Sequence, residues 1–227
     1  MPTSATTPLT VLQPVLQLLA LLQAHPTRRT IVGIVGLPGS GKSTIATQLA
    51  AAVNAQAGLG TVQALGMDGF HLSRAALAQM PDPAAALARR GAPWTFDPAG
   101  LAARITALRN ASLAPGAAPV LWPEFEHGVG DPQEDAVAIG PATRLVLVEG
   151  LYLLHRAHGW NLDGLLDMCW YLDVPMEVAM QRLVARHQAA WGFTVAQAEA
   201  RLALNDRLNA DTVALTRNLA DGLLPNL

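Results

Sequence analysis

The segment Gly36-Leu-Pro-Gly-Ser-Gly-Lys-Ser43 constrains this chain more than any other feature, because it fits the pattern G-x-x-x-x-G-K-[ST]. An apolar, β-branched run at residues 30–35 precedes it, and an alanine-rich stretch without proline follows it at 43–54. The run predicts a buried parallel strand, and the stretch predicts a helix. The pattern therefore lies in the strand–loop–helix context that a phosphate-binding loop requires.

This loop has the chemistry to hold a nucleoside triphosphate. Its glycines let backbone N–H groups converge on phosphate oxygens, and the following helix directs its positive end at the same anion. Lys42 is expected to reach the β- and γ-phosphates, and Ser43 to ligate Mg²⁺. The residues expected to bind the nucleotide are Gly36, Leu37, Pro38, Gly39, Ser40, Gly41, Lys42, Ser43 and Thr44. The loop alone does not choose among kinases, GTPases and motor ATPases, and a glycine-rich turn without a ligand is the alternative that its context disfavours.

The rest of the chain alternates apolar runs with helical stretches. Further strands are expected at residues 61–67, 144–148, 168–174 and 223–224. Helices are expected at 73–90, at 98–110 after a capping Asp97, from Pro175 to about 187, and at 194–219 with a break near Asn205. This alternation predicts one α/β domain over 1–227, with a P-loop NTPase fold: a parallel sheet, helices on both faces and a helical lid at 176–207.

The amino-terminal region is apolar enough to be considered as a membrane span. Residues 9–24 are apolar, but three glutamines and Pro14 interrupt them, and no basic segment precedes them. Because about 20 continuous apolar residues are needed to cross a bilayer, an amphipathic helix packed on the domain, within 1–27, is the preferred interpretation. The net charge of −2 favours neither nucleic acid nor membrane as a partner. The lone Cys169 cannot form an internal disulfide and lies in an apolar run, so we expect a buried thiol and a cytoplasmic location.

Residues 111–142 are rich in glycine, proline and aspartate, with one short apolar piece at 119–122. This composition predicts an irregular insertion over a site. Substrate loops are accordingly expected at 68–97 and 123–135.

Two acidic groups follow predicted strands, where ligands of open α/β sheets bind. Asp68 could accept the proton of a hydroxyl that attacks the γ-phosphate, although Asp-Gly is also a common turn dipeptide. Glu149 could hold Mg²⁺ directly or through water, or it could be a solvated strand-end acid.

Taken together, these motifs make the chain resemble the phosphoribulokinase/uridine kinase family of P-loop kinases, which includes bacterial pantothenate kinase. The resemblance is greatest to a fructokinase-like or nucleoside kinase-like bacterial branch, and it runs from about residue 31 to the carboxyl terminus. The segments that carry it are residues 36–44, Met67-Asp-Gly-Phe-His71, Arg90-Gly-Ala-Pro-Trp-Thr-Phe-Asp97, Pro123-Glu-Phe-Glu-His127, Val148-Glu-Gly150, Tyr171-Leu-Asp-Val-Pro175 and Asn205-Asp206 with Asn209. The resemblance implies that Asp68 is the general base. Two departures are Glu126, where many relatives have Asp, and Leu208, where the branch often has Pro.

The remaining candidates lie on the predicted lid and loops. Arg182 and Arg186 share a helix face and, by the resemblance, clamp the β- and γ-phosphates; a solvated basic face is the alternative. The next residue, His187, is expected to face solvent. Substrate contacts are expected from His71, Phe96, Phe125 and His127, together with Asp68 and Glu149, although a lone histidine is more often structural and loop aromatics can form a small core.

These observations predict an ATP- and Mg²⁺-dependent kinase acting on a hydroxyl of a small metabolite. A sugar such as fructose or a nucleoside such as uridine is suggested by the resemblance, with a pantothenate-like acceptor as the alternative within the class. A regulatory ATPase without a small acceptor is the rival from another class. A switch GTPase is disfavoured because the sequence has no Asn-Lys-x-Asp segment.

Overall fold

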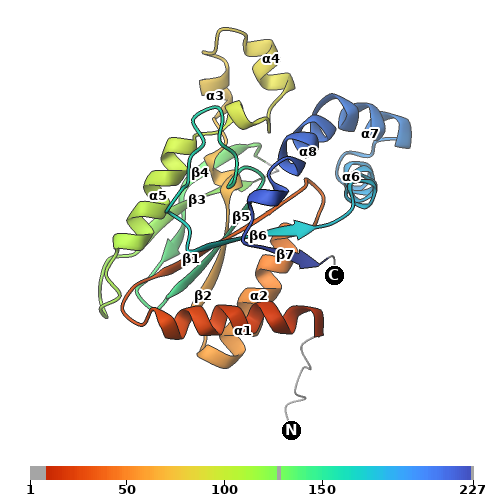
Figure 1. The fold of residues 1–227 in the computed structure, drawn as a ribbon. Coiled ribbons are helices and arrows are strands. Elements are labelled where there is room, and N and C mark those ends of the chain that lie inside the picture. The colour runs from red at the N-terminus through yellow and green to blue at the C-terminus, as the bar shows by residue number, and fades with distance from the viewer. Residues whose placement is uncertain (1–8, 127–128, 226–227) are drawn as a thin grey trace.

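A computed structural model describes residues 9–126 and 129–225. At its centre is a five-stranded sheet in the order β2-β5-β1-β6-β7 (Figure 1). β1 (Thr30–Gly36) lies between β5 (Leu145–Gly150) and β6 (Met168–Asp173), β2 (Val62–Gly66) pairs with β5, and β7 (Gly222–Pro225) pairs with β6. Every pair is parallel. The predicted α/β class and parallel sheet are confirmed, including the short last strand.

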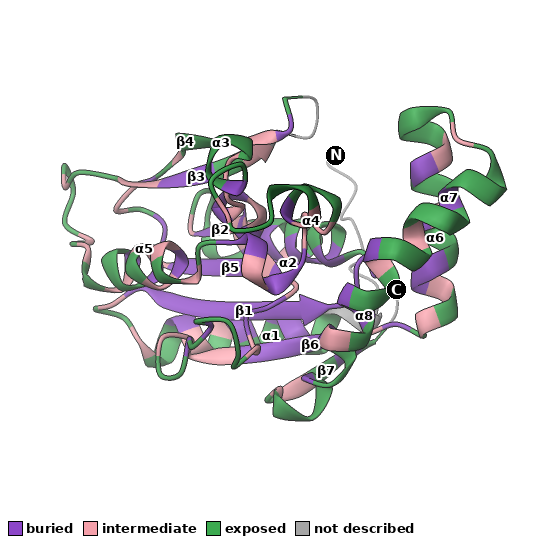
Figure 2. Ribbon diagram, turned by 90° about the horizontal axis from the view of Figure 1, so that it is seen from above, coloured by how far each residue is buried: buried purple, intermediate pink, exposed green. Residues whose placement is uncertain are grey.

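Helices lie around this sheet (Figures 1 and 2). Their bounds are α1 (Leu9–Ala24), α2 (Lys42–Ala57), α3 (Arg74–Leu77), α4 (Pro83–Ala88), α5 (Pro98–Asn110), α6 (Met176–Trp191), α7 (Val195–Arg201) and α8 (Arg207–Ala214). Asp97 caps α5 as predicted, since its side chain accepts a hydrogen bond from the Gly100 N–H. A π-helical turn at Leu202–Asp206 joins α7 to α8 and accounts for the break expected near Asn205.

The core forms between β1 and its flanking helices. All seven residues of β1 are buried (Figure 2), as expected of a central parallel strand. Helix α1 packs on the domain through Val15, Leu18 and Leu22, which confirms the amphipathic interpretation. Within residues 9–126 and 129–225, the helices are all too short or too polar to cross a bilayer. Cys169 is buried, as expected.

The prediction of an irregular insertion at 111–142 is wrong. Most of this segment forms an antiparallel hairpin of β3 (Val120–Glu126) and β4 (Asp131–Ile139), with a register shift between Trp122 and Glu124. Prolines and acidic residues in both strands conceal the alternation that marks a strand, because a two-stranded hairpin tolerates them at its edges. Trp122 is buried and its indole N–H donates to the Gly66 carbonyl oxygen at 2.9 Å. This bond fastens the hairpin to the end of β2.

Candidate functional site

The loop between β1 and α2 is packed directly against α6. Gly39 and Gly41 have φ angles of 78° and 95°, in the left-handed region that favours glycine. A Cβ atom on Gly39 would lie 2.4 Å from the carbonyl oxygen of Ala179 on α6. The loop therefore holds its shape through glycine and brings α6 against its outer side.

Lys42 begins α2 and is 9% exposed. Its Nζ atom donates to the Leu37 carbonyl oxygen at 3.0 Å, across the loop. Burial lowers the pKa of Lys42 below the ordinary lysine value, while the negative charges of Glu149 and Asp68 act in the opposite direction. Lys42, Glu149 and Asp68 thus act on one another electrostatically, although they come from three separate segments.

The hydroxyl of Ser43 donates to Glu149 Oε1 at 2.7 Å. Glu149 is the penultimate residue of β5, opposite Gly66 of β2, and burial raises its pKa, an effect opposed by the charge of Lys42. Within the described chain, no group of three or more His, Cys, Asp or Glu side chains could enclose a metal. A hydroxyl and a carboxylate oxygen nevertheless fit Mg²⁺, which binds through few protein oxygens together with phosphates and water. Ser43 and Glu149 are the two residues that could hold it.

Asp68 lies in the 3-10 turn Met67–Phe70 that follows β2. A Cβ atom on Gly69 would lie 2.1 Å from the Pro123 carbonyl oxygen, so only glycine lets this turn rest on β3. The charge of Asp68 acts on the pKa values of both Lys42 and Glu149. The two strand-end acids singled out from the sequence therefore lie together beside the loop.

The two arginines of α6 reach toward the same loop. Arg182 Nη1 donates to the Ser40 carbonyl oxygen at 3.0 Å. The positive charge of Arg186 lowers the pKa of Lys42. Beside them a cavity of about 340 Å³ is lined by Ser40, Gly41, Thr44, Ile45, Gln48, Leu172 and Arg182.

His71 and two aromatic rings stand next to Asp68. His71 Nδ1 lies 2.7 Å from the Asp68 carbonyl oxygen. Its ring centroid is 3.9 Å from that of Phe96 and 4.6 Å from that of Phe125. Phe96 is 3% exposed and also belongs to the core. It therefore fits the core interpretation of the loop aromatics as well as the substrate-contact interpretation. His127 lies outside the described residues.

The expectation that His187 faces solvent is wrong. This residue is 2% exposed, and its Nε2 lies 3.5 Å from Asp206 Oδ2. Burial lowers the pKa of His187, while the charge of Asp206 raises it. His187 lies on the inner side of α6, where the helix packs against the π-helical turn.

Sequence reasoning assigned no role to several polar residues on this side of the molecule. Arg90 Nη2 pairs with Asp131 Oδ1 at 2.7 Å, which ties the 68–97 segment to β4. Arg89 donates to the side-chain oxygens of Asn205 and Asn209. The signals that could have drawn attention to them are the consecutive arginines before Gly91 and the Asn pair at spacing i, i+4.

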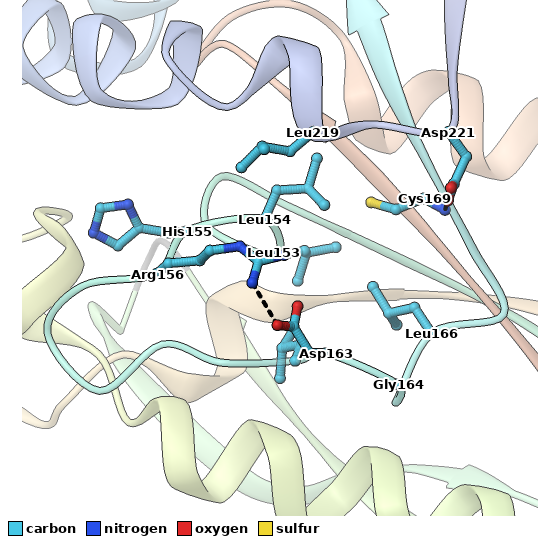
Figure 3. Close-up of a pocket in the computed structure, with 11 residues that line it drawn as sticks. Leu153, Leu154, His155, Arg156, Asp163, Gly164, Leu166, Cys169, Leu219 and Asp221 are labelled. Carbon is cyan, nitrogen blue, oxygen red and sulfur yellow. Dashed lines mark hydrogen bonds and ion pairs between the residues drawn. The ribbon is translucent and has the colours of Figure 1, made fainter.

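A second cavity, of about 210 Å³, lies at the other end of β6 (Figure 3). Cys169, near the start of β6, lines it, whereas Leu172, near the end of that strand, lines the cavity beside the phosphate loop. Arg156 and Asp163, which form an ion pair, also line it. This cavity is therefore separate from the site around Lys42.

Comparison with known proteins agrees with this geometry, although no protein-family model matches the chain. An ATP-dependent kinase-like protein of Aspergillus versicolor, notR', is 41% identical over 162 residues, which are 70% of this chain and 93% of that protein. A Schizosaccharomyces pombe protein, named provisionally as uridine kinase C227.14, is 34% identical over 203 residues, covering 88% of this chain and 84% of that protein. A solved structure from Silicibacter sp. TM1040, named provisionally as a fructose transport system kinase, superposes with a TM-score of 0.83 at 34% identity, covering 95% of this chain and 98% of that one.

The parallel sheet and the loop between β1 and α2 define a P-loop NTPase fold, and the ATP-dependent kinase relatives support ATP binding. With these relatives, the chain belongs to the phosphoribulokinase/uridine kinase family of P-loop kinases. It is a kinase and therefore a transferase.

Proposed function

We propose that this protein transfers the γ-phosphoryl group of ATP, with Mg²⁺, to a hydroxyl group of a small metabolite in the cytoplasm. The observation that carries the proposal is the convergence of Lys42, Glu149 and Asp68 at the end of the phosphate loop. A loop for the triphosphate, oxygens for the metal and a separate carboxylate are the parts that phosphoryl transfer to a hydroxyl needs.

Each residue then has a role in the transfer. The loop N–H groups and Lys42 hold the phosphates. Ser43 and Glu149 would hold Mg²⁺, which would supply positive charge to the phosphate oxygens. As the acceptor oxygen bonds to the γ-phosphorus, the bond from that phosphorus to the ADP oxygen breaks. The hydroxyl proton passes to Asp68.

Helix α6 and the following turns, residues 176–207, act in this proposal as the lid. Arg182 already contacts the loop at Ser40, so it needs no large movement to reach a phosphate. Arg182 and Arg186 supply positive charge to the transferring group. The cavity beside Thr44 and Gln48 has room for the nucleoside part of ATP.

The acceptor binds beside Asp68, against His71, Phe96 and Phe125. The sequence adds His127 to this proposed set. The names of the relatives point to a sugar such as fructose or a nucleoside such as uridine, and a pantothenate-like acceptor stays within the class.

A metabolite panel tests the function. ATP consumption is measured alone and with sugars, nucleosides and pantothenate, and product is identified by mass. Stimulation by one class with one phosphate added per ADP released is expected. Equal hydrolysis throughout, without a phosphorylated product, would contradict the proposal and favour a regulatory ATPase.

A further inference from the structure

Arg89 is held in place by two neutral side chains. It follows α4 directly and is half-buried. Its Nε donates to Asn205 Oδ1 at 3.2 Å, and its Nη2 donates to Asn209 Oδ1 at 3.3 Å. Both asparagines are buried, at 8% and 3% exposure. Figure 1 shows α4 and α8 near one another on the side of the molecule where these contacts form.

The two asparagines are themselves fixed. Asn205 lies in the π-helical turn and Asn209 in α8, one helical turn later. Asn205 Nδ2 donates to the Arg90 carbonyl oxygen at 2.8 Å, which anchors the segment that carries Arg89. The guanidinium is thus oriented before any ligand binds, which lowers the entropy cost of binding.

The two asparagines do not neutralise the charge of Arg89. Amide oxygens accept hydrogen bonds but carry no net charge. In the part of the chain that the structure describes, no carboxylate lies within ion-pair distance of Arg89, whereas the next residue, Arg90, pairs with Asp131 at 2.7 Å. The Nη1 group of Arg89, with two N–H donors, makes none of these hydrogen bonds. A half-buried guanidinium of this kind favours an anionic partner.

Tyr152 connects the segment that carries Arg89 to Phe96, which we propose contacts the acceptor. Its hydroxyl donates to the Gly91 carbonyl oxygen at 2.6 Å, and its ring packs edge-on against Phe96 at a centroid distance of 5.5 Å. The positive charge of Arg89 and the negative charge of Asp68 both act on the Tyr152 phenol. Arg89 and Asp68 are therefore both near enough to Tyr152 for their charges to act on it, as does that of Asp206.

We infer that the acceptor carries an anionic group, a carboxylate or a phosphate, which binds the Arg89 guanidinium while its hydroxyl is presented to Asp68. This inference rests on the proposed kinase function. It narrows the acceptor to hydroxy acids, which include a pantothenate-like acceptor, or phosphorylated alcohols, and disfavours neutral sugars and nucleosides. Guanidinium suits both groups because its planar N–H pairs match two oxygens. The competing explanation is that Arg89 only fastens α4 to α8.

The experiment compares acceptors that share a carbon skeleton and differ in whether they carry an anionic group. The full chain is assayed with glycerol, glycerate and glycerol 3-phosphate, and with glucose, gluconate and glucose 6-phosphate. We expect at least one acidic member to exceed its neutral partner about tenfold or more in kcat/KM. The carboxylate and phosphate arms show which anion the site takes.

Variants of Arg89 separate binding from structure. Arg89→Gln, which keeps an N–H donor for Asn205, should raise the KM for the acidic acceptor about 10- to 150-fold and change kcat much less, since a charge-assisted bond is lost. Arg89→Lys should recover part of the loss. Arg156→Gln is the matched control, because Arg156 is an exposed arginine paired with Asp163 at the cavity that is separate from this site. It should leave every KM unchanged.

Asn209→Asp gives an independent check that retains Arg89. The new carboxylate would pair with the guanidinium and should raise the KM for acidic acceptors selectively. The inference would be overturned if neutral and acidic acceptors had equal kcat/KM and if Arg89→Gln lowered kcat/KM for both to the same extent. The kinase function would then still stand. Absence of any phosphorylated product, while ATP still binds, would overturn the kinase function and the inference together.

Discussion

The two halves that we propose for the site, one for the ATP donor and one for the acceptor, are built in different ways. The donor half is essentially one continuous segment, residues 36–44, completed by Glu149 and the arginines of α6. The acceptor half is assembled from the turn at Asp68, the β3–β4 hairpin and the asparagines near α8. A loop of this kind can bind phosphate in any fold that places it between a strand and a helix. The acceptor half depends on tertiary contacts, so it can change its ligand without changing the fold.

Two glycines with similar φ angles test how the loop of the donor half is packed. Gly39 and Gly60 have φ angles of 78° and 80°, but a Cβ atom would lie 2.4 Å from Ala179 O at Gly39 and within 4 Å of nothing in the described chain at Gly60. Gly60→Ala should cost about 1–2 kcal/mol of unfolding free energy from the backbone alone. Gly39→Ala should cost about 1–3 kcal/mol more, because the loop and α6 must separate.

Chemical denaturation measures both losses, and ATP titration measures the loop. ATP affinity should fall for Gly39→Ala and stay unchanged for Gly60→Ala. If the two variants lose the same stability and bind ATP alike, the loop is not packed on α6 as described.

A smaller effect tests the electrostatics where the two halves meet. Lys42 is the only lysine in the chain, so ¹³C-lysine labelling gives a single side-chain Cε signal. Its titration midpoint should lie below the ordinary pKa of 10.5, because burial disfavours the charged form. Glu149→Gln should lower that midpoint further, since the Glu149 carboxylate favours protonated Lys42.

The sign of the Glu149→Gln shift is decisive. A midpoint that rises, or does not move, would mean that Glu149 and Lys42 do not interact. Asp163→Asn, which removes a carboxylate at the distant cavity, is the control and should leave the Lys42 midpoint unchanged.

The same division decides what could be predicted from the sequence. The sheet, the loop and the two strand-end acids were predictable because each is encoded by a local run and its end. The hairpin was not, since Pro123 and Pro132 interrupt the strand pattern and its stability comes from contacts such as Trp122 with Gly66. The burial of His187 depends on the π-helical turn that folds back onto α6.

The Arg89 contacts were equally beyond reach from the sequence. Arg89 and Asn205 are 116 positions apart. Local sequence periodicity cannot predict a contact between residues so far apart in the chain. The consecutive arginines and the Asn pair were visible, but only the fold shows that they meet.

The central claim is that the halves meet at Asp68, whose carboxylate serves the acceptor and not ATP. Asp68→Asn should retain ATP affinity within about twofold and lower kcat about 10²- to 10⁴-fold with the acceptor found in the panel, because a general base is removed. Asp211→Asn, on the outer surface of α8, is the control and should behave as the unmodified protein. Calorimetry of ATP binding together with single-turnover phosphoryl transfer measures both quantities. Phosphoryl transfer at a near-normal rate in Asp68→Asn would contradict the account.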